Sequence, residues 1–332
     1  MTCPHCGEAN AEGAAECARC GDALDGSTAR SFTALPGFAT IALIAVNVGV
    51  YVVMVAKGVG PMAPASEALV RWGANYAPFA TEGQWWRLLT ATFIHVGIVH
   101  LLMNMAVLWS IGRLMEPMFG QLDFLVLYFL AGVAGSLTSI VAHPLVVSAG
   151  ASGAIFGLYG GLLGVIAMRR DSMPNETRAG MLRYGVTFVM VNLAYGLTQK
   201  NIDMSGHIGG FLAGIPIGGA LSVGDVARVG PRWWRSAIVT LAGVGLLLVA
   251  AVRVPAVDDW LGELRRVAAL DTGNSAAFNA AVARVKASGL SNEGFARMID
   301  ETLLPPWEAE RAKLTALRIP ELERPRVQKL AA

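Results

Sequence analysis

Four polar residues within apolar stretches have side chains that together suit hydrolytic chemistry. Ser152 lies in SAGASGAIFGLYGGLLG, and His207 lies in SGHIGGFLAGIPIGG. A serine beside a histidine is a nucleophile beside its general base. His100 and Asn104, in HVGIVHLLMNM, are four residues apart and therefore share one helix face. Their side-chain N–H groups suit the stabilisation of an oxyanion.

Each of these residues also has an interpretation without catalysis. A serine at a glycine-rich helix start is often a packing residue, and a lone membrane histidine is often structural. The combination favours a hydrolytic site, with proton or ion transport as the competing interpretation. A proton transporter would require an acidic residue paired with a histidine within the membrane. No Asp or Glu lies near this depth in the apolar spans. Asp203 lies four residues before His207, at a loop edge, so we favour a Ser–His dyad over a triad.

The composition indicates an all-α polytopic membrane protein. Of 332 residues, 54% are apolar and 15% are charged, whereas soluble globular chains carry about 25% charged residues. The net charge of +2 gives no indication of nucleic-acid binding. A bilayer-spanning helix needs roughly 17–25 residues. We expect such helices at residues 38–56, 94–113, 122–142, 151–168, 183–199, 203–222 and 234–252.

The distribution of basic residues predicts the orientation of these spans. The first residues, MTCPHCGEAN, show neither a basic nor an apolar signal-peptide region, so we expect a cytosolic N-terminus and an extracytoplasmic C-terminus. The inner loops then carry nine Lys or Arg residues and the outer connections five, in agreement with the positive-inside rule. A prokaryotic plasma membrane is the expected location.

This orientation places the four candidate residues at similar depth. The second, fourth and sixth spans run inward, so Ser152, His207, His100 and Asn104 fall within roughly 15 Å of the outer helix ends. Small residues recurring every four positions let membrane helices approach closely. The sixth and fourth spans carry such glycine stripes, and facing stripes would bring Ser152 within hydrogen-bonding distance of His207. The stripes are Gly206, Gly210, Gly214 and Gly218, and Gly153, Gly157 and Gly161.

Four cysteines near the N-terminus predict a structural zinc site. They form two CxxC pairs separated by ten residues, a spacing that matches a tetrahedral Cys₄ site. Two disulfides or a redox CxxC are the alternatives, but so short a cytosolic segment needs a metal to fold. His5 competes as a ligand only if one thiolate is absent. The predicted ligands are Cys3, Cys6, Cys17 and Cys20.

Two outer segments have less specific patterns. The long loop 57–93 contains Trp85, Trp86 and Phe93, which suit the headgroup layer, so the loop is expected to lie on the membrane; an ordinary aromatic belt explains them equally well. Residues 253–332 are charged and helix-patterned. We expect a small helical appendage there, with breaks at Pro305, Pro306 and Pro320.

Five ordered motifs within residues 38–222 resemble the rhomboid family of intramembrane serine proteases. Singly each motif is weak, but five in this order at compatible spacings are specific. They are Trp86–Arg87, the His95–His100–Asn104 spacing, Glu116 to Gly120, GASGAIFG from Gly150, and GHIGGFLAG from Gly206.

The resemblance implies a role for each matching residue. Ser152 would be the nucleophile, His207 the general base, and His100 and Asn104 the oxyanion hole. His95, Gly150 and Phe156 would be supporting residues, Phe156 standing where the family usually has a tyrosine that stacks on the histidine. Two further matching residues look structural in the family, Arg87 and Glu116.

The resemblance also implies the reaction, namely hydrolysis of peptide bonds in or beside transmembrane segments of other proteins, without a metal or other cofactor. The expected partners are transmembrane substrates and the bilayer, with no nucleic acid. The zinc ribbon either binds a cytosolic partner or caps the N-terminus. A catalytically silent rhomboid-like protein that binds membrane clients is the alternative, although such relatives usually lack the serine or the histidine.

The predicted organisation is a rhomboid-like six-helix core with additions at both ends. A zinc ribbon at 1–24 and a linker at 25–37 precede the core at 38–222. A seventh transmembrane helix at 223–252 and the extracytoplasmic tail at 253–332 follow it.

Overall fold

The computed structural model describes residues 2–3, 8–14, 17–18, 24, 37–170, 173–198, 203–222, 233–287 and 289–318. It divides into two compact units. Unit 1 contains residues 1–76 and 84–254, and unit 2 contains residues 77–83 and 255–332. Of the predicted zinc ligands, Cys6 and Cys20 lie outside the described residues, as do Pro320 and most of the linker.

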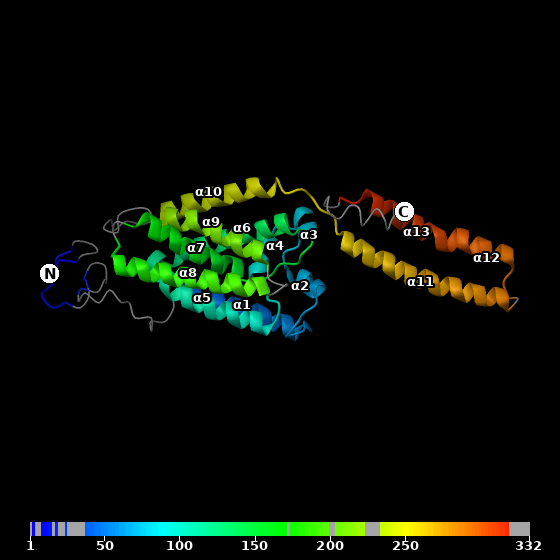
Figure 1. The fold of residues 1–332 in the computed structure, drawn as a ribbon, viewed down its shortest axis with the longest axis horizontal. Helices are drawn as coiled ribbons and strands as arrows, with labels where there is room; N and C mark the ends of the chain where they lie inside the picture. The colour runs from blue at the N-terminus through cyan, green and yellow to red at the C-terminus, as the bar shows by residue number, and fades with distance from the viewer. Residues whose placement is uncertain are drawn as a thin grey trace. The chain divides into compact units, whose positions relative to one another are not determined.

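Unit 1 is helical, as predicted, and its long helices run side by side (Figure 1). The helices of unit 1 are α1 (Phe38–Ala56), α2 (Ser66–Trp72), α4 (Arg87–Thr90), the 3₁₀ turn η1 (Ala91–Phe93), α5 (Ile98–Phe119), α6 (Gln121–Ala142), α7 (Ser152–Met168), α8 (Asn175–Thr198), α9 (Met204–Ser222) and α10 (Trp233–Ala251). Each of the seven predicted spans is therefore a helix. Among the described helices, α1, α5, α6 and α10 are long and apolar enough to cross a membrane, and α7 is apolar but shorter. The chain is thus a multi-pass integral membrane protein.

Three predicted helix boundaries were wrong. The second span begins at Ile98 rather than residue 94, because Gly97 adopts φ +113 and ends the preceding extended segment. It also continues past residue 113 to Phe119, since Glu116 is buried against another helix instead of facing water. The fifth span, predicted at 183–199, is α8 and begins at Asn175.

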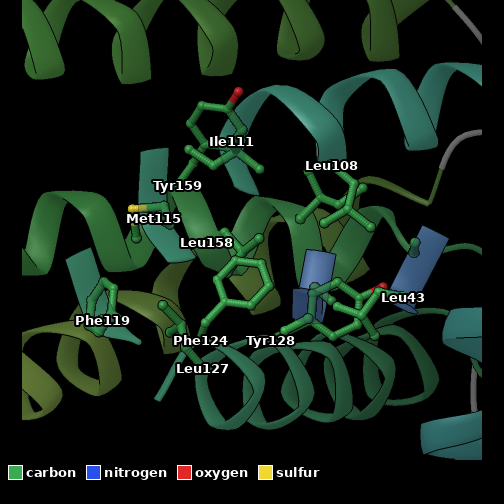
Figure 2. Packing of buried hydrophobic residues seen from close by; sticks show 14 of the residues in the cluster. Leu43, Leu108, Ile111, Met115, Phe119, Phe124, Leu127, Tyr128, Leu158 and Tyr159 are labelled. Atoms are coloured by element: carbon green, nitrogen blue, oxygen red, sulfur yellow. The ribbon is translucent and has the colours of Figure 1, made fainter. Parts of the chain in front are cut away.

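Helix α7 is the central element of unit 1, contacting α5, α6, α8 and α9. Apolar side chains from α1, α5, α6 and α7 form one continuous core around it (Figure 2). Fully buried side chains on these helices include Leu108, Phe124, Tyr128 and Leu158. This core fixes α7, and with it the position of Ser152 at the first turn of α7.

The glycine stripes of α7 and α9 face each other, as the sequence predicted. A Cβ at Gly214 would overlap the carbonyl group of Gly157, and a Cβ at Gly210 would overlap that of Gly153. The two backbones therefore touch directly, with no side chain between them. Close backbone approach of this kind replaces the missing hydrophobic driving force between helices in lipid.

A buried carboxylate joins α1 to α5. Glu116 accepts hydrogen bonds from the backbone N–H groups of Ala39 (2.9 Å) and Thr40 (2.8 Å), and from the Thr40 hydroxyl (2.6 Å). The N-cap residue Gly37 has no side chain to do this, and a Cβ there would overlap the carboxylate. Glu116 thus caps α1 from a neighbouring helix and complements its dipole. This contact agrees with the structural role that the sequence suggested.

Helix α10 is attached to the bundle at its first turn. The Ser236 hydroxyl donates to the Asp123 carboxylate on α6, and Arg235 donates to the backbone oxygen of Leu221 on α9 (2.9 Å). Arg235 also lies 3.9 Å from Asp123. Beyond this turn most of α10 is exposed, including Leu241 and Leu246, as expected of a lipid-facing helix.

Unit 2 combines a segment of the long loop with the C-terminal tail. Its elements are α3 (Ala77–Thr81), α11 (Trp260–Lys286), α12 (Asn292–Met298), the π-helical turn η2 (Ile299–Leu303) and α13 (Leu304–Ala316). Arg318 donates to Asp258 (Nε to Oδ1, 2.9 Å) and to Glu82 (3.4 Å). The hydrogen bonds from Arg318 lower the pKa of the Asp258 carboxyl. These contacts join residues 77–83 to the tail.

The predicted break at Pro305 and Pro306 was wrong. These prolines occupy the first turn of α13, which continues directly from η2. A proline is tolerated there because the first N–H groups of a helix have no acceptor within the helix.

We predict that Gly214→Ala destabilises the bundle. The added methyl group must push α9 away from the backbone of α7, at a cost of about 1–3 kcal/mol for overpacking. The matched control is Gly245→Ala on α10, where a Cβ meets nothing within 4 Å. Thermal unfolding in detergent should show a lower midpoint for Gly214→Ala alone; equal midpoints would show that the α7–α9 contact is not tight.

Candidate active site

Ser152 is the first residue of α7, and a short constrained loop leads into it. Gly150 adopts φ +133, a conformation that L side chains rarely adopt, and its N–H donates to the carbonyl oxygen of Ala91 (2.9 Å). A Cβ at Gly150 would lie 2.6 Å from His100 Cε1, 3.1 Å from His100 Nε2 and 3.6 Å from Ser152 Oγ. The absence of a side chain at Gly150 therefore allows the His100 ring to pack closely against this loop.

His207 lies in the first turn of α9 and faces Ser152. Its Nε2 is 2.8 Å from Ser152 Oγ, a hydrogen-bonding distance. Phe156, one turn after Ser152, stacks on the imidazole with ring centroids 4.4 Å apart and an interplanar angle of 11°. The ring stack limits rotation of the imidazole, so its Nε2 stays directed at the hydroxyl.

Asp203 does not hydrogen-bond to the His207 ring. Its Oδ1 accepts from the N–H of Gly206 (3.0 Å), and its Oδ2 accepts from the Ser148 hydroxyl (2.6 Å). His207 Nδ1 is buried and has no hydrogen-bond partner among the described residues. The geometry is thus that of a pair, serine and histidine, rather than of a serine–histidine–carboxylate triad.

His100 and Asn104 lie on the first turns of α5, beside the serine loop. His100 Nδ1 accepts from the Val96 N–H (3.4 Å). The other ring nitrogen, Nε2, lies on the side of the ring close to Gly150. Asn104 is buried, and its side-chain amide donates to the carbonyl oxygen of His100 (2.9 Å). This bond uses one of the two amide protons.

His95 does not lie on α5, as the predicted span required, but in the turn before it. The side chain is fully buried, and its ring centroid lies 5.3 Å from that of His100. The His95 ring therefore packs against the His100 ring.

Arg87 organises the long loop instead of contacting the site. Its guanidinium donates to the Gln84 side chain (2.8 Å) and to the carbonyl oxygen of Ala74 (3.1 Å), and lies over the Trp86 ring. A buried cation that joins three points of a loop is a structural residue, in agreement with the expectation from the sequence.

Sequence reasoning missed one link at this site, between Ser148 and Asp203. Ser148 also exchanges two backbone hydrogen bonds with Asn75, each 2.9 Å. A possible signal was present in the sequence: an Asp three residues before Gly206, at the start of an apolar helix, is a typical N-cap. Its second partner, 55 residues away, gives no local sequence signal.

Together, these groups can perform nucleophilic catalysis. A neutral imidazole at 2.8 Å from a hydroxyl can take the proton as the oxygen attacks a carbonyl carbon. The hydroxyl lies at the N-terminus of α7, close to the loop that contacts His100. The helix N–H groups and the His100 imidazole are therefore the donors that could stabilise a developing negative charge.

We predict that Gly150→Ala lowers the unfolding midpoint more than Gly58→Ala does. Both glycines have positive φ, so both substitutions pay a backbone cost of roughly 1–2 kcal/mol. Only the alanine at position 150 also collides with His100, since a Cβ at Gly58 meets nothing within 4 Å. Differential scanning fluorimetry in detergent measures both; a smaller loss for Gly150→Ala would contradict the tight contact with His100.

Comparison with known proteins places the chain in a family. The family model for the Rhomboid domain matches residues 82–223. The chain is 38% identical over 182 residues to Rhomboid protease GluP of Bacillus subtilis (strain 168), covering 55% of this chain and 35% of that protein. It is 36% identical over 194 residues to Rhomboid-like protease 1 of Toxoplasma gondii, covering 58% and 65%. The chain thus spans between about a third and two thirds of these two relatives.

A third relative is matched over more of its length. Rhomboid-like protease 2 of Toxoplasma gondii is 31% identical over 199 residues, which is 59% of this chain and 69% of that protein. The region that the family model matches, residues 82–223, contains Ser152, His207, His100 and Asn104. Sequence motifs, helical architecture and these relatives agree, and the chain belongs to the rhomboid family.

Proposed function

We propose that this protein is an intramembrane serine endopeptidase that hydrolyses peptide bonds in or near transmembrane segments of other membrane proteins, using Ser152 and His207 as a catalytic dyad. The 2.8 Å contact between Ser152 Oγ and His207 Nε2 is the observation that carries the proposal. The names of the relatives, which are rhomboid proteases, support the reaction class.

The proposed reaction begins with attack by Ser152 on the peptide carbonyl carbon. As the Oγ–C bond forms, the hydroxyl proton moves to His207 Nε2, and the carbonyl oxygen becomes an oxyanion. Collapse of this intermediate breaks the C–N bond, and His207 returns the proton to the leaving amine. A water molecule then attacks the acyl ester, with His207 again taking and returning a proton, and Ser152 is restored. No cofactor takes part in these steps.

We propose that the oxyanion forms beside His100 and the start of α7. The His100 ring lies against Gly150, and the Ser152 N–H at the start of α7 has no acceptor within its own helix. The second amide proton of Asn104 is the third donor that we propose. Each donor of this kind contributes about 2.7–4 kcal/mol of transition-state stabilisation in a serine protease.

The proposed substrates are single-span or multi-span membrane proteins. Ser152 and His207 lie at helix ends inside an apolar bundle, so a peptide bond must reach them from the membrane or from its surface. The resemblance to the family adds a preference for small residues at the cut and helix-breaking residues nearby, because an α-helical peptide bond is not accessible to a nucleophile.

The alternative, a catalytically silent rhomboid-like protein that binds membrane clients, is not favoured. A silent protein has no need for a serine and a histidine in hydrogen-bonding contact, stacked by Phe156. Both residues are present and paired.

We propose that the N-terminus is cytosolic and that the C-terminal tail is extracytoplasmic. Residues 77–83, which belong to the loop after α1, form one compact unit with the tail. Glu82, Asp258 and Arg318 join these segments, so the loop and the tail must lie on the same side of the membrane. A cytosolic N-terminus then places both outside, on the side where Ser152 and His207 lie.

We predict that Ser152→Ala and His207→Ala each abolish cleavage of a single-span model substrate by the purified protein in detergent. Each removes one partner of the proton transfer, so kcat should fall by at least about 10³-fold. The matched controls are Ser66→Ala and His143→Ala, which replace exposed residues of the same types and should cleave like the wild type.

Cleavage that survives in Ser152→Ala would contradict the mechanism. Loss of activity in the two control variants would show that the assay reports general damage to the protein.

We also propose that Cys3, Cys6, Cys17 and Cys20 bind a structural zinc ion. Cys3 and Cys17 are both buried in one small cluster with Leu24, so two of the four thiols are already brought together. The Cys3 N–H donates to the Glu8 carbonyl oxygen (2.8 Å). Asn10 donates to Cys17 Sγ (3.5 Å), a contact typical of a thiolate acceptor. A metal ion bound by these thiolates would fold the N-terminal segment.

We predict about one zinc ion per chain by elemental analysis of the purified protein. Cys3→Ser should lower the zinc content, since one thiolate ligand is lost, while cleavage by the membrane core should persist. A metal-free N-terminal segment with oxidised cysteines would contradict the zinc site.

A further inference from the structure

We propose that Asp203 is a positioning residue that fixes the register between the Ser152 loop and the His207 helix. The proposal rests on the dyad function proposed above. Its basis is geometric: the two oxygens of one carboxylate bind two different segments, and each segment carries one member of the dyad.

The first oxygen fixes the start of the His207 helix. Asp203 Oδ1 accepts from the N–H of Gly206 at 3.0 Å, and the backbone oxygen of Asp203 accepts from the N–H of His207 at 3.3 Å. Asp203 is thus the N-cap of α9, immediately before the turn that carries the imidazole. The cap determines where the first helical turn begins and so the direction in which His207 leaves it.

The second oxygen fixes the serine loop. Asp203 Oδ2 accepts from the Ser148 hydroxyl at 2.6 Å, four residues before Ser152. The backbone of Ser148 is itself held by Asn75 through two hydrogen bonds of 2.9 Å, and the Asn75 side chain donates to the backbone oxygen of Ser136 on α6 (2.8 Å). The loop end is therefore attached both to α9 and to the rest of the bundle.

Two parallel hydrogen bonds result, with equal spacing on both segments. Ser148 pairs with Asp203, and Ser152 pairs with His207, so the bonds are four residues apart on each segment. A single bond between the loop and the start of α9 permits sliding and rotation, whereas two bonds four residues apart on each segment oppose both. Reactive groups that move by about 1 Å from their productive position lose roughly 10²-fold in rate.

This role differs from that of the acid in a catalytic triad. A triad acid accepts from the histidine Nδ1, and its charge is required. Here both oxygens of Asp203 are bound to Ser148 and Gly206, and His207 Nδ1 has no hydrogen-bond partner among the described residues. The hydrogen bonds, not the charge, should therefore be what the reaction needs.

The comparison of Asp203→Ala with Asp203→Asn separates these roles. Alanine removes both bonds, so we expect kcat to fall about 10- to 100-fold with KM within about twofold of the wild type, because the substrate-binding surface is retained. Asparagine keeps an acceptor for Gly206 and offers its NH₂ group to the Ser148 hydroxyl, so it should recover kcat to within about threefold of the wild type. The assay is the cleavage of a single-span model substrate, with the rate of reaction with a fluorophosphonate as a second readout.

The chain offers a matched control. Asp259 caps α11 with the same geometry, accepting from the N–H of Gly262 at 3.0 Å. Asp259→Ala should lower neither kcat nor the fluorophosphonate rate. If Asp203→Ala fails to fold, Ser148→Ala tests the proposal instead, since it removes only the bond to the loop and should lower kcat about tenfold.

Three results would overturn the proposal. An unchanged kcat in Asp203→Ala would show that the register is fixed without it. An asparagine variant as inactive as the alanine variant would show that the charge is required. Unchanged activity in Ser148→Ala would show that the loop does not depend on Asp203. Cleavage by a parallel Ser152→Ala sample would instead refute the dyad, whereas an inactive Ser152→Ala beside a fully active Asp203→Ala would refute only the positioning role.

Discussion

The contact between the backbones of α7 and α9 is the constraint on which the site depends. Gly210, Gly214 and Gly218 of α9 lie so close to the backbone of α7 that there is no room for a side chain at these positions. Because the backbones touch, sliding one helix along the other causes collisions, and separating the helices loses their packing contacts. Ser152, one position before Gly153, and His207, three positions before Gly210, are consequently held close together, and their side chains meet at 2.8 Å. The glycine spacing that packs the two helices therefore also positions the polar pair.

Several other buried polar groups attach helices of the bundle to one another, and these bonds offset the cost of placing a polar group in hydrocarbon, which is several kcal/mol when it is unpaired. Glu116 caps α1, and Asp123 binds the first turn of α10. A third group, Tyr184, joins α8 to the bundle through hydrogen bonds with Tyr159 (3.1 Å) and Ser110 (2.8 Å). Each contact attaches a peripheral helix to the central α5–α6–α7 group. The Ser152–His207 pair differs from them because it joins a hydroxyl to an imidazole, groups that suit a nucleophile and its base.

The sequence predicted the seven long helices and the meeting of the glycine stripes, because hydropathy and four-residue spacing are local signals. It misplaced the start of α5, since apolar residues continue through Gly97 and hide the break caused by its positive φ. It also ended α5 too early, because Glu116 is polar by type but buried against α1. The pairing of Ser148 with Asp203 spans 55 residues and needs the fold itself. Contacts of this kind, fixed by tertiary packing, have no periodicity that a sequence can show.

The most direct test of the account is the mapping of the reactive serine. The purified protein would be treated with a fluorophosphonate, digested and analysed by peptide mass spectrometry, beside His207→Ala. The account predicts one adduct, on Ser152 in the wild type, and almost none in the variant, because the hydroxyl loses its base. An adduct on a different serine, or equal labelling of Ser152 without His207, would contradict the claim that the contact between these two helices creates the nucleophile.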